Sequence, residues 1–202
     1  MAFSFFFRDV PALETAAQAM IEQTQGQSRI RVWVAGCAMG QEVYTLAILL
    51  AERMHYFAFQ NLVIYASDIE KDFGDIVNRG EYEWGDIERI PDNLRDKYFA
   101  ETGKAGVFAI NSILRSRVTF VHHDLLTLTP VCEEVSLIVC KNVLLHFQPE
   151  ERIEVFRMFH KTLSRNGILA NENTQKLPEE VKGLFQQVSN DSQVYRKVEG
   201  GR

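Results

Sequence analysis

The chain has 202 residues, of which 46% are hydrophobic and 24% are charged, and its formal net charge is −5. This apolar content is sufficient for the buried core of a single globular domain. The negative charge argues against nucleic-acid binding, which depends on cationic side chains that neutralise phosphates. No apolar run approaches the ~18 residues that span a bilayer, so we expect no direct membrane insertion.

The amino-terminal run Phe5–Phe7 is too short for the apolar core of a signal peptide and is closed by charged residues. The three cysteines (Cys37, Cys132 and Cys140) are odd in number and lack the spacing of metal ligands. We therefore expect reduced thiols, no bound metal and a cytoplasmic protein.

Strand-like and helical segments alternate along the chain, which predicts an α/β fold with a mostly parallel sheet covered on both faces. We expect strands near residues 31–35, 62–67, 118–122, 135–140, 167–172 and 193–198. We expect helices over residues 9–25, 41–55, 70–79, 149–164 and 178–186, with Gly167 ending the fourth of these before a buried strand. The segment Gly80–Arg117 is too long for an ordinary connection, and its aromatic and strand-like residues predict a small insertion.

A turn that contains Gly36 and Gly40 follows the first expected strand, and Asp68 ends the second. Glycines let a backbone turn approach a ligand closely, the helix amino terminus offers free N–H groups, and an acid at a strand end accepts ribose hydroxyls. The pair predicts a pocket for an adenosine-bearing cofactor. Taken alone, the glycine turn need not bind anything, and Asp68 would equally serve as the N-cap of a helix beginning near Glu70.

Other candidate residues each have a structural alternative. Glu42 either faces a sugar or cationic group of the ligand or simply complements the dipole of its helix. Lys141 and Asn142 follow a buried strand, where open α/β sheets bind ligands, although Asn142 is also a common turn residue. His146 either points into the same cleft or packs as a structural residue. Arg8, after three phenylalanines that should be buried, either borders the pocket or lies on the surface.

Six segments resemble, in order, the pattern of CheR-type chemotaxis receptor methyltransferases. They are FSFFFRD (Phe3–Asp9), VWVAGCAMGQEVYTLAI (Val32–Ile48), ASDI (Ala66–Ile69), GEY (Gly80–Tyr82), CKNVLLHF (Cys140–Phe147) and SQVYRKV (Ser192–Val198). The resemblance covers nearly the whole chain. It implies a class I S-adenosylmethionine-dependent methyltransferase fold, Rossmann-like and doubly wound, with a seven-stranded sheet and a small β-insertion. It also implies methyl transfer from S-adenosylmethionine to glutamate side chains of receptors.

The resemblance also implies the site. The cofactor contacts of the family fall on Ser4, Arg8, Glu42, Asp68, Asp124, Leu125, Lys141 and Asn142, beside the turn glycines Gly36 and Gly40. Asp68 matches the acid that binds the adenosine ribose. Arg8 matches the arginine of the reaction centre, and His146 replaces a family tyrosine there. The chain also has Lys141 where the family has arginine and Asp124 where it has asparagine.

We expect one methyltransferase domain over residues 1–202, with a small inserted subdomain at 80–117 and no counterpart of the family's helical amino-terminal domain. The expected partner is the cytoplasmic part of a chemoreceptor-like protein. Two alternatives stay open. The first is a catalytically degenerate domain that binds S-adenosylmethionine or S-adenosylhomocysteine as a sensor or scaffold. The second is a methyltransferase with a different acceptor.

Overall fold

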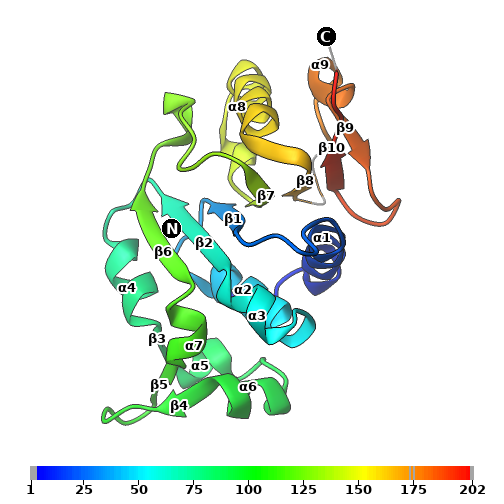
Figure 1. Ribbon diagram of the computed structural model, residues 1–202. Helices are drawn as coiled ribbons and strands as arrows, with labels where there is room; N and C mark the ends of the chain where they lie inside the picture. Colours follow the sequence, from blue (N-terminus) through cyan, green and yellow to red (C-terminus); the bar gives the residue numbers. More distant parts are fainter. Residues whose placement is uncertain (1–3, 173, 175, 201–202) are drawn as a thin grey trace.

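A seven-stranded sheet forms the centre of the molecule (Figure 1). The structure is a computed structural model that describes residues 4–172, 174 and 176–200, so Phe3 of the phenylalanine motif lies outside it. In sheet order the strands are β6 (Val118–His122), β2 (Leu62–Asp68), β1 (Ile30–Ala35), β7 (Val135–Cys140), β8 (Leu163–Asn171), β10 (Val194–Lys197) and β9 (Phe185–Gln187). The pairs from β6 to β8 are parallel, whereas β10 is antiparallel to both β8 and β9. The expected seven-stranded sheet is confirmed.

Helices cover both faces of this sheet. They are α1 (Val10–Gln23), α2 (Gln41–Arg53), α3 (Tyr56–Gln60), α4 (Phe73–Arg79), α8 (Pro149–Thr162) and α9 (Glu179–Lys182), with short 3-10 helices η1 (Leu125–Thr127) and η2 (Leu144–His146). Strand β1 is apolar because both of its faces are buried. Val32 and Val34 pack into the core that contains α1 and α2, whereas Trp33 and Ala35 pack into the core that contains α8. Alternate residues of a strand face opposite sides, so a sheet covered twice requires an uninterrupted apolar strand.

No helix in the described part of the chain has the length and apolar character that a membrane span requires.

Three expected elements differ from the structure. The helix expected over residues 178–186 is only the short α9, because Phe185 is buried and pairs with Lys197 as part of β9. Strand β8 begins at Leu163, directly after α8, rather than near Gly167, because Leu163 already pairs with Val135 of β7. Helix α4 begins at Phe73 rather than near residue 70, because residues 69–72 form a turn that follows β2.

The segment between Gly80 and Arg117 contains a small antiparallel sheet in the order β3–β5–β4. Its elements are β3 (Glu81–Glu83), α5 (Trp84–Ile87), α6 (Asp92–Tyr98), β4 (Phe99–Glu101), β5 (Val107–Ile110) and α7 (Ser112–Arg115). Figure 1 shows this insertion at the end of the molecule away from α8 and α9.

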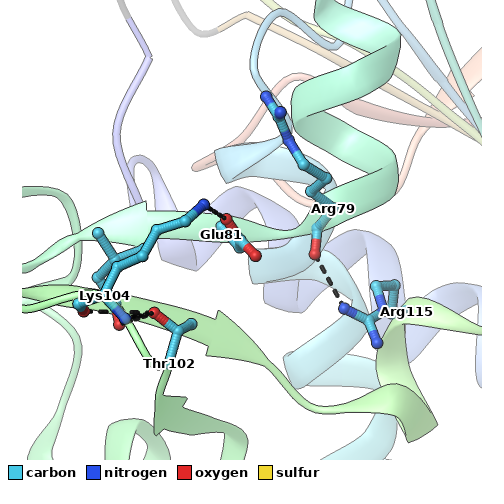
Figure 2. A network of polar contacts seen from close by, with 6 residues as sticks. Arg79, Glu81, Thr102, Lys104 and Arg115 are labelled. Carbon is cyan, nitrogen blue, oxygen red and sulfur yellow. Dashed lines mark hydrogen bonds and ion pairs between the residues drawn. The ribbon is translucent and has the colours of Figure 1, made fainter.

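Polar contacts at the surface of the insertion join its hairpin turn to β3 and join α7 to the end of α4, as Figure 2 shows. The ammonium of Lys104 lies 3.2 Å from the Glu81 carboxylate, and the Arg115 guanidinium donates to the carbonyl of Arg79 at 2.9 Å. Thr102 Oγ1 donates to the carbonyl of Val107 beside the hairpin turn. The Lys104–Glu81 pair is exposed, so we expect it to add less than about 1 kcal/mol to stability.

The insertion contacts the amino-terminal motif through Phe6, which is 1% exposed. The Phe6 ring packs edge-on against Tyr82 of β3 and Phe99 of β4, with ring centroids 4.9 and 5.5 Å apart. Of the three phenylalanines, Phe6 is buried, whereas Phe5 and Phe7 are half-buried. Phe6 therefore anchors the chain immediately before Arg8.

We expect Phe6→Ala to lower the free energy of unfolding by about 3–5 kcal/mol, because it leaves a cavity between two well-packed aromatic rings. Urea denaturation measures this change. The matched control is Phe57→Ala, since Phe57 is 81% exposed and its removal should change stability by less than about 0.5 kcal/mol. A loss at Phe6 no larger than the loss at Phe57 would contradict this packing.

Candidate functional site

A cavity of about 550 Å³ lies where the carboxyl ends of the parallel strands meet. Its volume is within the ~300–1,000 Å³ that is usual for small-molecule sites. The predicted site residues that line it are Ser4, Arg8, Gly36, Glu42, Asp68, Asp124, Leu125, Lys141, Asn142 and His146. Gly40 is not among the lining residues. The structure therefore brings together all the candidates except this glycine.

The turn after β1 is tied to the end of β2. The N–H groups of Gly36 and Cys37 both donate to the carbonyl of Ser67, at 2.8 and 2.9 Å. Gly36 has a φ of +80°, and a Cβ atom there would lie 2.1 Å from Val143 Cγ2. Glycine is required at this position because the turn approaches the loop after β7 so closely.

Gly40 serves the fold rather than the wall of the cavity. It has a φ of +91°, and it immediately precedes α2. A Cβ atom at this position would lie 2.9 Å from Tyr82 Oη, whose hydroxyl donates to the carbonyl of Met39. Gly40 therefore lets α2 begin next to the insertion.

Asp68 lies beside the glycine turn, as its distance along the chain predicts. Its Oδ2 accepts a hydrogen bond from the N–H of Ala38 at 2.9 Å, and its Oδ1 accepts one from the N–H of Glu70 at 3.1 Å. The N-cap alternative is wrong, because α4 begins at Phe73 and its N-cap is Asp72. Each Asp68 oxygen accepts one backbone donor and retains a second lone pair for a ligand in the cavity.

Arg8 borders the cavity, and neighbouring side chains orient its guanidinium. Its guanidinium donates to Asn142 Oδ1 at 3.2 Å, and its Cζ lies 5.5 Å from the centroid of the Phe5 ring. Phe7 and Asp9, on either side, have left-handed φ values of 59° and 51°. Such conformations are costly for residues other than glycine and cluster at functional sites. The surface alternative for Arg8 is therefore wrong.

An ion pair of Lys141 connects the start of α1 with the end of β7. Its ammonium lies 2.9 Å from Asp9 Oδ2, and its side chain is 0% exposed. The Asp9 side chain is 39% exposed, so the loss of Asp9 would leave the buried Lys141 ammonium without this partner. Thr45 of α2 adds a second attachment, because its Oγ1 accepts from the N–H of Phe7 at 3.0 Å.

Glu42 lies in the first turn of α2 and faces the cavity. Burial raises its pKa to about 7, although Lys141 and Arg8 act in the opposite direction. A carboxyl group with a pKa near 7 is readily protonated, and a cationic partner stabilises its ionised form. Glu42 therefore suits a cationic group of a ligand.

Asp124 and His146 line the cavity from the loops that follow β6 and β7. Asp124 Oδ1 accepts from the N–H of Leu126 at 2.9 Å and caps η1. His146 ends η2 and is exposed, so the alternative of a packed structural histidine is wrong.

Other lining residues were not among the sequence candidates. They are Cys37, Ala38, Ser67, Ile69, His123, Leu126, Val143, Leu145 and Phe147. Most of them directly neighbour a predicted residue at a strand end, so their position along the chain was a usable signal. Glu172, which accepts a hydrogen bond from the backbone of Asn142, also lies at a strand end but is not among the lining residues.

Comparison with known families agrees with this geometry. Residues 2–194 match the model of the S-adenosylmethionine-binding domain of CheR methyltransferases. The chain belongs to this family. The resemblance of the six sequence segments is thereby confirmed, and so is the class I methyltransferase fold.

The chain is similar to curated proteins of several bacteria. It is 33% identical over 172 residues to the putative methyltransferase Cher3 of Pseudomonas putida, with 82% of this chain and 62% of the relative covered. It is 31% identical over 168 residues to a chemotaxis protein methyltransferase of Listeria innocua, with 82% and 62% covered. It is 29% identical over 191 residues to chemotaxis protein methyltransferase 1 of Pseudomonas aeruginosa, with 87% and 68% covered. The chain thus spans less than two thirds of the length of the first two.

S-adenosylmethionine is the cofactor of this CheR domain, and the cavity suits it. The Gly36 turn admits a close ligand, and the Asp68 carboxylate matches a pair of ribose hydroxyls. The Glu42 carboxyl matches an ammonium group, and Lys141 and Asn142 of the same cavity are the residues that would hold the amino-acid part. When bound, the cofactor supplies an electrophilic methyl group on a sulfonium sulfur.

Proposed function

We propose that this domain transfers the methyl group of S-adenosylmethionine to glutamate side chains in the cytoplasmic part of a chemoreceptor-like protein. The observation that carries this proposal is the Arg8 guanidinium, which is held at the wall of the cofactor cavity by Asn142 and Phe5. A planar cation at this place binds a carboxylate with two parallel hydrogen bonds. The names of the relatives, chemotaxis protein methyltransferases, support the same class of substrate.

The acceptor chemistry needs little from the chain. A glutamate side chain is already ionised at pH 7, so no residue has to remove a proton. The tasks that remain are to orient the carboxylate and to exclude water from a reaction that neutralises opposite charges. Arg8 orients the acceptor in this account, and the apolar side chains of Leu145 and Phe147 at the cavity exclude water. His146, which lines the cavity, offers a hydrogen bond in place of the family tyrosine.

The cofactor is proposed to contact all the predicted lining residues. Asp68 binds the ribose, Asp124 and Leu125 flank the adenosine end, and Lys141 with Asn142 binds the amino-acid end. Ser4 and Glu42 complete this end of the cavity.

The cytoplasmic location is part of the same proposal. Burial of the Cys140 thiol raises its pKa well above the usual range, so this cysteine behaves as a reduced apolar side chain.

Cofactor binding should depend on pH through Glu42. Its pKa of about 7 makes the carboxyl mostly neutral at pH 6, whereas the ammonium of the cofactor favours the ionised form. Binding below this pKa therefore releases a proton, and the affinity should rise between about pH 6 and pH 8 and then level off. Calorimetry in two buffers of different ionisation enthalpy measures both the affinity and the released proton. Glu42→Gln should bind more weakly with a flatter profile between these pH values, and an unchanged slope in this variant would contradict the assignment.

A methyl-transfer assay tests the proposed function. We would incubate the protein with S-adenosylmethionine labelled in the methyl group and with a cytoplasmic chemoreceptor fragment, then treat the product with mild alkali. A glutamyl methyl ester releases volatile labelled methanol, and this is the expected result. Label that resists alkali would indicate a different acceptor. Cofactor binding without any transfer would indicate a sensor or scaffold.

A further inference from the structure

Glu172 lies immediately after β8, at the carboxyl edge of the sheet. Because Asn171 pairs with Cys140 in the parallel β7–β8 register, Glu172 lies next to the first residues after β7. Its Oε2 accepts a hydrogen bond from the N–H of Asn142 at 2.5 Å, and the residue is 2% exposed. Its Oε1 is buried with no hydrogen-bond partner among the residues that the structure describes.

The backbone that Glu172 holds has an uncommon conformation. Asn142 has a φ of 59°, in the left-handed region that asparagine adopts more readily than most residues other than glycine. Such a conformation persists where surrounding contacts over-determine it. The hydrogen bond that the Asn142 N–H donates to the buried carboxyl group of Glu172 is a contact of this kind.

This left-handed backbone sets the direction of the Asn142 side chain. Asn142 Oδ1 accepts the hydrogen bond from the Arg8 guanidinium at 3.2 Å. A continuous path of two hydrogen bonds therefore connects Glu172, which does not line the cavity, to Arg8, which does.

The remainder of the loop after β7 is held from α8. The Arg152 guanidinium donates to the carbonyl of Phe147 at 2.9 Å and to the carbonyl of Leu145 at 3.3 Å. The loop that carries Asn142 and His146 is thus fixed at its start by Glu172 and near its end by Arg152.

Side chains of the loop and of the next helix surround the Glu172 carboxyl group. Burial raises the pKa of this group, and the N–H of Asn142 acts against that rise, as do Arg152, His146 and Lys141. All three side chains belong to the loop or to the helix that follows it. The Glu172 carboxyl group therefore lies among the groups that hold this part of the site.

We propose that Glu172 is a positioning residue of the methyl-transfer site: its carboxylate fixes the backbone of Asn142 and, through the Asn142 side chain, the orientation of Arg8. This inference rests on the proposed function for its catalytic consequence, but its structural part is independent of turnover. A residue that only fills buried space would affect stability without affecting Asn142 or Arg8 selectively.

Three substitutions separate position from charge. Glu172→Ala removes the acceptor, Glu172→Asp keeps the charge but withdraws the oxygens by one methylene group, and Glu172→Gln keeps an acceptor of the same reach. The matched control is Thr162→Ala, because Thr162 is also buried and lies next to the opposite end of β8, where its hydroxyl donates to Met158. Thermal unfolding identifies any variant that is simply unfolded.

The first measurement is amide hydrogen exchange at Asn142. We expect the Asn142 amide to exchange at least about tenfold faster in the Ala and Asp variants, while the Gln variant and the Thr162 control remain close to the unsubstituted protein. The second measurement is methyl-transfer kinetics. We expect kcat to fall by about 100-fold in the Ala and Asp variants, with a smaller change in the KM for the protein acceptor.

Two results would overturn the proposal. One is unchanged Asn142 exchange in both the Ala and Asp variants. The other is a Gln variant as impaired as the Ala variant, which would assign the effect to charge. If the unsubstituted protein transfers no methyl group, the proposed function fails, but the exchange measurement still decides the role of Glu172.

Discussion

Arg8→Ala is expected to lower kcat for methyl transfer by about 10²–10³-fold, the usual effect of removing one preorganised donor from a reaction centre. The guanidinium is stacked on Phe5, bonded to Asn142 and flanked by two strained residues, so it is oriented before any acceptor arrives. Its loss removes the group that aligns the acceptor carboxylate. Steady-state kinetics with labelled cofactor measures the change.

The control for this prediction is Arg8→Lys. Lysine keeps the positive charge but lacks the planar fork that binds a carboxylate with two hydrogen bonds and stacks on an aromatic ring. We therefore expect a kcat between those of the arginine and alanine forms. Activity of the alanine variant within about threefold of the unsubstituted protein would exclude Arg8 from the reaction centre.

Asp68→Ala should weaken the binding of S-adenosylmethionine by at least about 100-fold. Two charge-assisted hydrogen bonds to ribose hydroxyls are lost, each of about 1.5–3 kcal/mol, and every 1.4 kcal/mol is about tenfold in affinity. The same substitution releases the N–H groups of Ala38 and Glu70, which loosens the glycine turn. Isothermal titration of the variant measures the loss.

The matched control is Asp72→Ala. Asp72 lies on the same loop and is exposed, and its side chain makes no capping hydrogen bond to α4. Its replacement should leave the cofactor affinity unchanged. Equal losses at the two positions would mean that Asp68 acts through the general charge of the loop rather than through contact with the ribose.

The sequence predicted the cofactor side of the cavity well, because parallel strands place their carboxyl ends at one edge. This rule brings Asp68 beside the glycine turn, and it locates Lys141 and Asn142 opposite them. For Arg8, the preceding phenylalanines left both the pocket border and the surface open, and the family resemblance implied a place at the reaction centre. Nothing in the local pattern around residue 8 predicts its contact with the end of β7.

Features that depend on pairing across the sheet could not be predicted in this way. Glu172 reaches Asn142 because of the β7–β8 register, and no local periodicity encodes register. The same reason explains the carboxyl-terminal error, since Phe185 reads as part of a helix but is drawn into β9 by its antiparallel neighbour β10. Gly40 was predicted to contact the ligand. Its actual neighbour is Tyr82, which is distant along the chain, so the local pattern could not predict this contact.

The most direct test of this account is a calorimetric titration of the protein with S-adenosylmethionine and S-adenosylhomocysteine. We predict that both ligands bind with micromolar dissociation constants in the cavity at the carboxyl edge of the sheet, and that Asp68→Ala abolishes the heat of both. The absence of binding by either ligand to the folded protein would contradict the account, because every role assigned here begins with an occupied cofactor cavity.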